Sequence, residues 1–274
     1  MKADLHNHSY YSDGVLSPCE VVRLARKAGC DLFSLTDHDT IDGIVEAKLE
    51  AERLEVSFVN GVEISAFWQN SPIHIVGLGI DIDNDMLQSG LAFNQAIRKE
   101  RAEKIALGLW RSGIKDALEK AQKISGGYML TRTHFAQMLI QEGYCKDMKS
   151  VFRRYLTGSK PGAVRAEWKN FDEVINWIQS AGGKALIAHP FRYRMTQTKI
   201  KKMLNDFKLA SGDGFEVVNA NSSEEEISLG NQWSENFDLL ASIGSDFHGW
   251  PNQRVQIGNL ADLPSAKRAI WGYL

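Results

Sequence analysis

Apolar residues along this chain follow two alternating patterns. Short continuous apolar runs, such as residues 31–35 and 56–64, are separated by segments like residues 42–54, where apolar residues recur three and four positions apart. A short apolar run bounded by turn residues is typical of a buried strand, and the second spacing is typical of an amphipathic helix. Strands and helices that alternate over short links predict an α/β fold with parallel strands, either doubly wound or closed into a barrel.

The first helix shows how sharply such a segment can be bounded. Ser17 stands at the N-cap position, Pro18 at the first helical position and Glu20 at the third, which is the capping-box arrangement. Gly29 then predicts the end of the helix after residue 28. The same reasoning predicts strands at residues 73–80, 184–188, 214–219 and 239–245, and helices at residues 171–180, 196–210, 223–236 and near 265–273.

The pattern changes between residues 83 and 165. Helical spacing dominates there, and turn sequences such as Ser112-Gly113 separate the helical segments. We therefore predict a barrel domain formed by residues 1–82 and 166–274, and a helical insertion domain, residues 83–165, that covers the active site. Its predicted helices are residues 85–111, 115–124, 131–141 and 147–156.

Composition narrows the class of protein. The 274 residues are 43% hydrophobic and 24% charged, an ordinary globular balance that gives no reason to expect disorder. The net charge of −2 creates no overall field for nucleic acid or an anionic membrane, so any preference for anions must come from local charge. Three cysteines without C-x-x-C spacing, together with the lack of a signal sequence or long apolar run, predict a cytoplasmic protein. No protein partner is implied.

Candidate chemistry begins with two histidines near the start of the chain. His6 and His8 share one face of a predicted strand, about 7 Å apart along it, so both imidazoles can reach one metal ion. An isolated pair of this kind is more often two exposed histidines. Here, however, Asp246 and His248 repeat the spacing near the other end of the chain. A closed fold would bring the two pairs together.

Further candidate ligands lie at or near the ends of other predicted strands. In parallel α/β folds, functional groups gather at the carboxyl ends of the strands. Mixed histidine and carboxylate ligands suit Zn²⁺, Mn²⁺ or Fe²⁺ better than Ca²⁺ or Mg²⁺. The full set exceeds what one ion can use, so we predict two or three divalent ions. The candidate ligands are His6, His8, Asp13, His38, Glu63, His74, His189, Asp246 and His248.

The charge of such a centre indicates its substrate. Three carboxylates against two or three divalent cations leave a net positive site, which attracts an anion such as a phosphate ester. Paired metal ions acidify a shared water and stabilise the entering and leaving oxygens of a phosphoester displacement. The sequence contains no G-x-x-x-x-G-K-[ST], G-x-S-x-G or C-x-x-C motif, so NTPase, serine hydrolase and thiol redox chemistry have no support.

Six short motifs are spread from the first predicted strand to the last. They are Asp4-Leu5-His6-Asn7-His8-Ser9, Ser12-Asp13-Gly14, Thr36-Asp37-His38-Asp39-Thr40, Gly61-Val62-Glu63-Ile64-Ser65, Ala188-His189-Pro190 and Gly244-Ser245-Asp246-Phe247-His248. Together they resemble the polymerase and histidinol phosphatase (PHP) family, which implies a distorted (β/α)₇ barrel with a two- or three-metal phosphoesterase site. Residues 101–105 and 133–136 of the insertion resemble the branch of 3′,5′-nucleotide bisphosphate phosphatases and 5′→3′ exoribonucleases.

The resemblance also implies a distribution of the ligands. His6, His8, Glu63 and Asp246 would hold the first metal, and Glu63 would bridge to a second ion held by His74 and His189. Asp13, His38 and His248 would hold a third ion and contact the reacting phosphate. Many family members have histidine in place of Asp13; an oxygen ligand there favours a harder ion, so Mn²⁺ is the first choice, with Zn²⁺ and Fe²⁺ as alternatives. His248 and Asp13 are the catalytic candidates for assisting departure of the leaving oxygen.

The insertion supplies candidates for binding a second phosphate. Arg98 and Arg101 share a helix face, and a guanidinium matches a phosphate with two parallel hydrogen bonds. With His134, they are expected to hold a phosphate that is not hydrolysed, whereas Lys99 and Lys104 read as solvated charges. Four aromatic residues could stack on a base near the cleft, although such residues more often pack: Phe67, Trp68, Phe191 and Tyr193. Trp168 is assigned to packing.

We therefore expect an enzyme that removes the 3′-phosphate of nucleoside 3′,5′-bisphosphates to leave the nucleoside 5′-monophosphate. A 5′→3′ exoribonuclease acting on 5′-phosphorylated RNA through the same site is the main alternative. A histidinol-phosphate phosphatase is a weaker one. A non-enzymatic binding domain is disfavoured because every ligand position of the motifs is filled.

Overall fold

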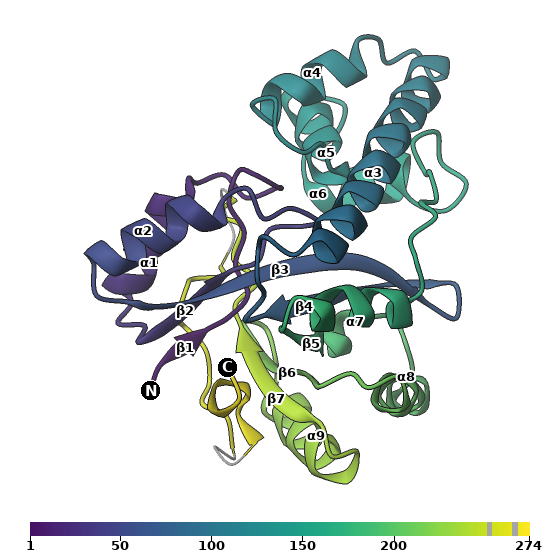
Figure 1. Ribbon diagram of the computed structural model, residues 1–274. Coiled ribbons are helices and arrows are strands. Elements are labelled where there is room, and N and C mark those ends of the chain that lie inside the picture. The colour runs from purple at the N-terminus through teal and green to yellow at the C-terminus, as the bar shows by residue number, and fades with distance from the viewer. Residues whose placement is uncertain (251–253, 265–267) are drawn as a thin grey trace.

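The computed structural model describes residues 1–250, 254–264 and 268–274. Seven strands form one sheet in sequential order, β1 to β7 (Figure 1). The strands are β1 (Ala3–Asp4), β2 (Leu32–Leu35), β3 (Ser57–Trp68), β4 (Ser71–Leu78), β5 (Lys184–Ile187), β6 (Gly214–Asn219) and β7 (Leu240–Gly244). The chain after β1 lies beside β7, where the amide of Leu5 donates to the carbonyl of Ile243 at 3.1 Å. This contact nearly closes the sheet into the barrel that the sequence predicts.

One strand runs against the predicted direction. β4 is antiparallel to both β3 and β5, whereas all other neighbouring strands are parallel. Only Gln69 and Asn70 separate β3 from β4, and both have positive φ, +46° and +61°. Two consecutive residues in the left-handed region are typical of a tight hairpin, which leaves no room for a crossover helix. The expectation of uniformly parallel strands is therefore wrong at β4.

Helices pack around the barrel close to their predicted positions. The helix α1 (Pro18–Lys27) has the predicted capping box, in which Ser17 and Glu20 satisfy one another's backbone amides. Such a cap stabilises a helix by about 1 kcal/mol. The other helices of the barrel are α2 (Ile44–Arg53), α7 (Phe171–Ser180), α8 (Gln197–Leu209) and α9 (Glu224–Asn236).

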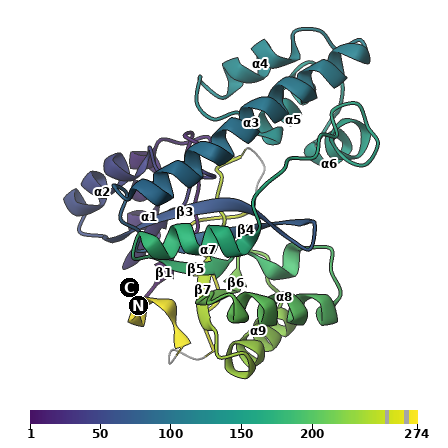
Figure 2. The same cartoon turned by 45° about the vertical axis from the view of Figure 1, so that its right-hand side comes forward.

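The segment predicted as an insertion is helical and has a core of its own. It contains α3 (Asp85–Arg111), α4 (Ala117–Ile124), α5 (Arg132–Gln141), α6 (Met148–Val151) and a π-helical turn, η1 (Phe152–Leu156). Leu87 and Leu91 of α3 belong to the barrel core, whereas Ile105 and Leu109 belong to the insertion core. Figure 2 shows this one long helix passing from the barrel into the insertion, which it therefore ties to the barrel.

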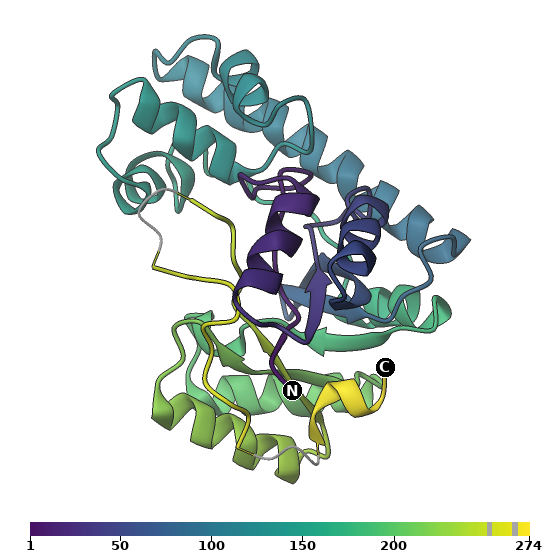
Figure 3. The same cartoon turned by 90° about the vertical axis from the view of Figure 1, so that its left-hand side faces the viewer.

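The chain after β7 passes from the barrel toward the insertion and returns, so that both termini lie at the barrel (Figure 3). Residues 265–267 of the helix predicted near 265–273 lie outside the described residues; the described part contains a short 3₁₀ turn, η4 (Ile270–Gly272). Among the described residues, no helix combines the length and apolar character needed to cross a membrane.

Candidate metal centre

The nine predicted ligand residues come together at one end of the barrel. His6 and His8 follow β1 on either side of Asn7, and their Nε2 atoms lie 3.1 Å apart, as expected for residues on one face of an extended segment. Both side chains are fully buried. His74 reaches the same end from β4 because that strand runs in the opposite direction, which places its first half beside the last half of β3.

Glu63 is the hub of the cluster. Its Oε2 atom lies 3.3 Å from Nε2 of His6 and 2.7 Å from Nδ1 of His38. Its Oε1 atom lies 2.9 Å from Nδ1 of His74 and 3.0 Å from Nε2 of His189. A single buried carboxylate therefore contacts imidazoles from four segments of the chain.

Ligand atoms within 4.8 Å of one another form three overlapping groups. These groups are His6, His8, Glu63 and Asp246; His38, Glu63 and His74; and His8, Asp13, His38 and His248. The first corresponds to the predicted first metal. The other two groups share His38, and the third also includes His8. Individual residues therefore lie within reach of more than one of the three predicted metal ions. The assignment of individual ligands to individual ions stays a prediction.

Electrostatics within the cluster keep its carboxylates charged. Burial by itself raises the pKa of a carboxyl group, but the surrounding histidines outweigh it and hold the pKa values of Glu63, Asp13 and Asp246 well below their usual range. Burial is also the main influence on His8 and lowers its pKa to about 3, with help from His248 and His38. For His248, burial lowers the pKa, but the carboxylates of Asp13 and Asp246 prevail and raise it to about 9.

The donor atoms of this cluster fit divalent cations. Four buried atoms among the nine residues make no hydrogen bond of acceptable geometry in the described structure, although three of them face another candidate ligand atom: Oδ1 of Asp13, Nδ1 of His38, Oε2 of Glu63 and Nδ1 of His189. Buried polar atoms without a partner cost free energy, so such a concentration indicates that another group is needed to satisfy them. Histidine nitrogens and carboxylate oxygens are ligands for transition-metal ions.

The backbone at the cluster is strained at three strand ends. Asp39, His189 and Asp246 have φ values of +49°, +32° and +56°, although none of them is glycine. Left-handed backbone of this kind costs about 1–3 kcal/mol per residue and persists where the surrounding structure enforces it. At Asp39 the enforcing contacts are a hydrogen bond from the amide of Ser65, at 2.9 Å, and the ion pair with Arg98.

Glu216 is a component of the centre that the sequence reasoning missed. It lies in β6, is 2% exposed, and places Oε1 2.5 Å from Nδ1 of His6, while its Oε2 accepts the amide of His189 at 2.6 Å. A carboxylate behind a metal-ligating histidine fixes the orientation of the ring and its tautomer. The feature of the sequence that could have identified Glu216 is an acidic residue inside an otherwise mostly apolar predicted strand. Nearby, Arg192 forms an ion pair with the candidate ligand Asp246.

Two cavities border the cluster, each lined by different candidate ligands. The first, with a volume of about 470 Å³, we call the arginine pocket; Asp13, His38 and His74 line it together with Arg101 and Arg132. The second, of about 1230 Å³, we call the lysine groove; Asp246 and His248 line it together with Lys146 and Lys149. Thr133 borders both. The candidate metal centre therefore borders a small pocket and a larger groove.

Of the four arginines that line the pocket, Arg165 donates to the carbonyl of Asn70, and the other three differ in their partners. Arg98 forms an ion pair with Asp39, which is fully buried, and donates to Oγ of Ser65 at 2.8 Å. Arg101 donates only to the carbonyl of Val164, and neither it nor Arg132 has an ion pair within the described chain. Burial, followed by the positive charges of Arg132 and Arg98, lowers the pKa of Arg101 to about 9. The pocket thus holds uncompensated positive charge on Arg101 and Arg132, the second of which the sequence reasoning did not single out.

Aromatic rings line the same pocket, and an arginine covers each of them. The guanidinium carbons of Arg98, Arg132 and Arg165 lie 5.3, 5.6 and 5.1 Å from the ring centres of Trp168, Phe152 and Phe67, respectively. Trp168 was predicted to pack, but it also faces this pocket, as Phe67 does. Such pairs fix the arginines while leaving aromatic surface beside their charge.

His134 lies apart from the two arginines with which it was grouped. Its Nδ1 atom accepts the amide of Thr131 at 3.0 Å in the cap of α5, and the residue borders the lysine groove rather than the arginine pocket. The neighbouring Thr133 donates from Oγ1 to Oδ2 of Asp13 at 2.9 Å. The start of α5 therefore connects the insertion to the candidate metal centre through Asp13.

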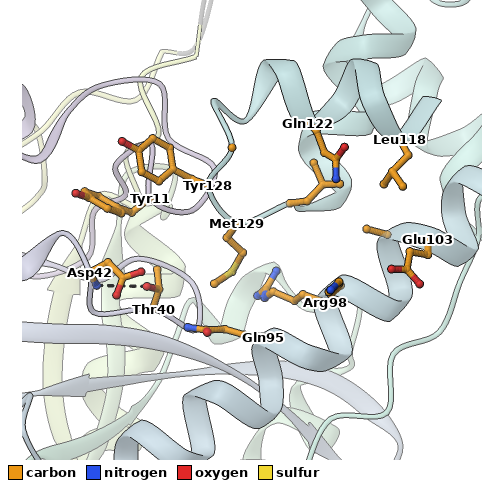
Figure 4. Close-up of a pocket in the computed structure, with 14 residues that line it drawn as sticks. Tyr11, Thr40, Asp42, Gln95, Arg98, Glu103, Leu118, Gln122, Tyr128 and Met129 are labelled. Carbon is orange, nitrogen blue, oxygen red and sulfur yellow. Dashed lines mark hydrogen bonds between the residues drawn. The ribbon is translucent and has the colours of Figure 1, made fainter. Parts of the chain in front are cut away.

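A further cavity of about 650 Å³ lies on another side of Arg98, between the barrel and the insertion (Figure 4). Tyr11, Thr40 and Asp42 line it from the barrel, and Lys99 and Gln122 from the insertion. None of the nine candidate ligand residues borders it. Lys99 accordingly offers a positive charge on the insertion that is remote from the centre.

Comparison with known proteins agrees with this geometry. The sequence model of the PHP domain matches residues 4–215. A 3′,5′-nucleoside bisphosphate phosphatase from Chromobacterium violaceum is 41% identical over 269 residues, covering 98% of this chain and 94% of that protein. A 5′-3′ exoribonuclease from Haemophilus influenzae is 39% identical over 273 residues, covering 98% of each protein. A solved structure of an amidohydrolase from Chromobacterium violaceum, with bound sulfate and no metal, has a TM-score of 0.92 at 40% identity and covers 99% of this chain and 95% of that one.

Proposed function

This chain belongs to the PHP domain family, and from that premise we propose that it is a metal-dependent phosphoesterase that removes the 3′-phosphate of nucleoside 3′,5′-bisphosphates. The observation that carries the proposal is the position of Arg101 and Arg132. Their uncompensated charges share one pocket with Asp13, His38 and His74. One phosphate can therefore lie at the metal ligands while the arginines hold another, which requires a substrate with two phosphates.

The arginine pocket has the size and lining that a nucleotide needs. Its volume of about 470 Å³ falls within the usual range of about 300–1,000 Å³ for small-molecule sites. Phe67, which is half-buried, offers aromatic surface for a base, and the guanidinium groups offer paired donors for the 5′-phosphate. The solved Chromobacterium violaceum structure contains sulfate, an anion with the tetrahedral geometry of phosphate, which is consistent with an anion site in this fold.

The residues of the cluster would hold two or three divalent ions, with Mn²⁺ as the proposed metal. We assign His6, His8, Glu63 and Asp246 to one ion, His74, His189 and Glu63 to another, and Asp13, His38 and His248 to a third. Such ions supply an acidified water and positive charge for phosphoester hydrolysis. Glu216 would keep the ring of His6 in its ligating orientation, because its Oε1 contacts Nδ1 and leaves Nε2 facing the cluster.

The proposed reaction breaks the bond between phosphorus and the 3′ oxygen of the sugar. The oxygen of water adds to phosphorus, and the departing 3′ oxygen takes up a proton. Asp13 borders the pocket that would hold the sugar, and its Oδ1 lies 3.2 Å from Nε2 of His248. We propose that Asp13 and His248 assist the departure of this oxygen when the third ion is absent, because the same two atoms cannot hold that ion and a transferable proton at once. Thr133 would fix Asp13 for this role through its hydrogen bond to the other carboxylate oxygen.

A second candidate function, 5′→3′ exoribonuclease activity, is favoured by the lysine groove. Cleavage of a 5′-phosphorylated RNA after its first nucleotide breaks the same kind of bond, between phosphorus and a 3′ oxygen. The difference is that the phosphate carries the rest of the strand, which needs space beyond the metal ligands. A histidinol-phosphate substrate has a single phosphate and would leave the charges of Arg101 and Arg132 without an anion.

Hydrolysis of three adenine nucleotides tests the proposal. With Mn²⁺, we expect kcat/KM for adenosine 3′,5′-bisphosphate to exceed that for adenosine 3′-monophosphate at least tenfold, because only the bisphosphate engages the arginines. Adenosine 5′-monophosphate should be hydrolysed far more slowly than either. Equal rates on the bisphosphate and the 5′-monophosphate would show that the 3′ ester is not the preferred bond and would overturn the assignment.

A further inference from the structure

Two cavities border the candidate metal centre, and different candidate ligands line each of them. Asp13, His38 and His74 border the arginine pocket, whereas Asp246 and His248 border the lysine groove. A phosphodiester held at the ligands can therefore place one nucleoside in the pocket and the other in the groove. At about 1230 Å³, the groove exceeds the usual upper size of about 1,000 Å³ for small-molecule sites. Its size suits a continuing strand better than a second small ligand.

The walls of the groove carry positive charge that has no evident structural use. Lys146 and Lys149 are exposed and have no ion pair among the described residues, whereas Arg192, which also lines the groove, is paired with Asp246. The acidic lining residues are Asp246, which belongs to the candidate centre, and Asp147, which accepts the amide of Ser150 at 2.7 Å as the cap of α6. The lysines are therefore free to meet an external anion.

Aromatic residues accompany these charges. Tyr10 and Trp250, both half-buried, line the groove, and the ring of Tyr10 is stacked on that of Tyr128 with centres 4.8 Å apart. Surfaces that bind single-stranded nucleic acid combine a positively charged groove for the phosphates with aromatic side chains for the bases. The lysine groove has both features and begins at the candidate catalytic residues.

We propose that the lysine groove binds the 3′ continuation of a 5′-phosphorylated single-stranded RNA whose first nucleotide lies in the arginine pocket. This inference rests on the proposed phosphoesterase function and assigns a location to its second substrate. Lys146 and Lys149 contact backbone phosphates beyond the cleaved bond, and Tyr10 meets a base.

The chemistry of cleavage then explains why such a strand is shortened from its 5′ end. Water adds its oxygen to the phosphorus that joins the first two nucleotides, the bond to the first 3′ oxygen breaks, and that oxygen takes up a proton. The first nucleotide leaves as a 5′-monophosphate. The remaining strand keeps the phosphate as its new 5′ end, which is the group that the arginine pocket binds. Each cut thus regenerates a substrate that is one nucleotide shorter.

A charge-reversal variant tests the assignment. The double substitution Lys146→Glu and Lys149→Glu should reduce kcat/KM for a 5′-phosphorylated decamer of adenylate at least tenfold, while hydrolysis of adenosine 3′,5′-bisphosphate changes less than twofold. The matched control, Lys99→Glu, reverses a charge on the insertion that faces the cavity of Figure 4 and should leave both rates unchanged. The double variant should also weaken the dependence of decamer binding on salt, by about 0.7 in the logarithmic slope for each lysine.

Three results would overturn the groove assignment. The first is unchanged decamer cleavage by the double variant, and the second is an equal loss on the decamer and the bisphosphate, which would place the effect in the centre itself. The third comes from fluorescence anisotropy of a labelled decamer, measured with chelator so that binding is separated from hydrolysis. Equal affinity of the wild type and the double variant for the decamer in that measurement would refute RNA binding by the lysine groove. By contrast, a wild type that binds the decamer through these lysines but hydrolyses neither substrate would refute only the phosphoesterase proposal.

Discussion

Oε1 of Glu216 lies 2.5 Å from Nδ1 of His6, with both side chains buried beneath the candidate ligand cluster. The other oxygen of the same carboxylate accepts the amide of His189 at 2.6 Å. Glu216 therefore fixes one candidate ligand by its ring and another by its backbone. Glu216 thus orients two candidate metal ligands without itself being one of the nine candidates.

Replacing Glu216 with glutamine should weaken metal binding more than it weakens the fold. Loss of a carboxylate behind a ligating histidine typically costs 10- to 100-fold in metal affinity or activity. We expect a fall of about that size in Mn²⁺ affinity, measured by isothermal titration, and in kcat. Glu225→Gln, on the exposed face of α9, is the control and should behave as wild type. Wild-type Mn²⁺ affinity in the Glu216 variant would show that its contact with His6 is incidental.

Substitution of Arg101 should separate substrates by their number of phosphates. A hydrogen bond to a charged group contributes about 1.5–3 kcal/mol, so Arg101→Met should raise KM for adenosine 3′,5′-bisphosphate about 10- to 100-fold. KM for adenosine 3′-monophosphate should change less than twofold, because that substrate has no 5′-phosphate. Lys99→Met, on the same helix, serves as the control. A similar rise in KM for both substrates would contradict the role of Arg101 in holding the second phosphate.

Arg98, one helical turn earlier, should respond differently. Its loss leaves the buried carboxylate of Asp39 without its cation, and breaking a buried pair in this way costs about 3–5 kcal/mol. We expect Arg98→Met to lower the free energy of unfolding by about 3 kcal/mol in urea titrations, and Arg101→Met to lower it by less than about 1 kcal/mol. Equal stability of the two variants would contradict the division between a structural and a ligand-binding arginine.

Thr133 offers a test of the contact between the insertion and Asp13. Thr133→Val removes the hydroxyl that donates to Oδ2 of Asp13 and should lower kcat about three- to tenfold, since one hydrogen bond contributes about 0.5–1.5 kcal/mol. KM for the bisphosphate should stay close to wild type. Thr133→Ser keeps the hydroxyl and should restore most of kcat, whereas a defect of equal size in both variants would exclude the hydrogen bond as the cause.

Thermal unfolding should depend on divalent metal. At a Mn²⁺ concentration 100 times the dissociation constant, binding to the folded state alone adds about 2.7 kcal/mol. For a protein of this size that corresponds to a rise in Tm of roughly 5–10 °C over the chelator-treated sample. Glu63→Gln removes the carboxylate that contacts five imidazoles and should abolish the rise. A rise of equal size in this variant would place the stabilising ion elsewhere.

The sequence predicted much of this architecture because local signals agreed with the fold. The capping box at Ser17 and the extents of α3 and α7 follow from residues adjacent in the chain. The direction of β4 was missed because apolar spacing is the same in parallel and antiparallel strands. The two-residue link at Gln69 and Asn70 was the available evidence, since it is too short for a crossover.

The residues of the candidate site could be predicted from the sequence where they lie within short recognisable motifs. The nine proposed ligands could be proposed together because short motifs mark most of them, and the fold brings eight into overlapping groups, with His189 in contact with Glu63. Arg132 and Glu216 were missed because their roles depend on partners distant in sequence. An arginine that lacks a carboxylate partner looks the same in sequence as Arg98, which has one, so only the packing of Asp39 separates the two cases.

The nearly closed barrel has a consequence for protein synthesis. His6 and His8 are made almost at once, whereas Asp246 and His248, which lie against them, emerge more than two hundred residues later. A ribosome-bound chain that stops before β7 therefore lacks the last two candidate ligands and also the strand that closes the sheet. Hydrolytic capacity would arise in a single late step, and fragments released early would be unable to attack cellular nucleotides.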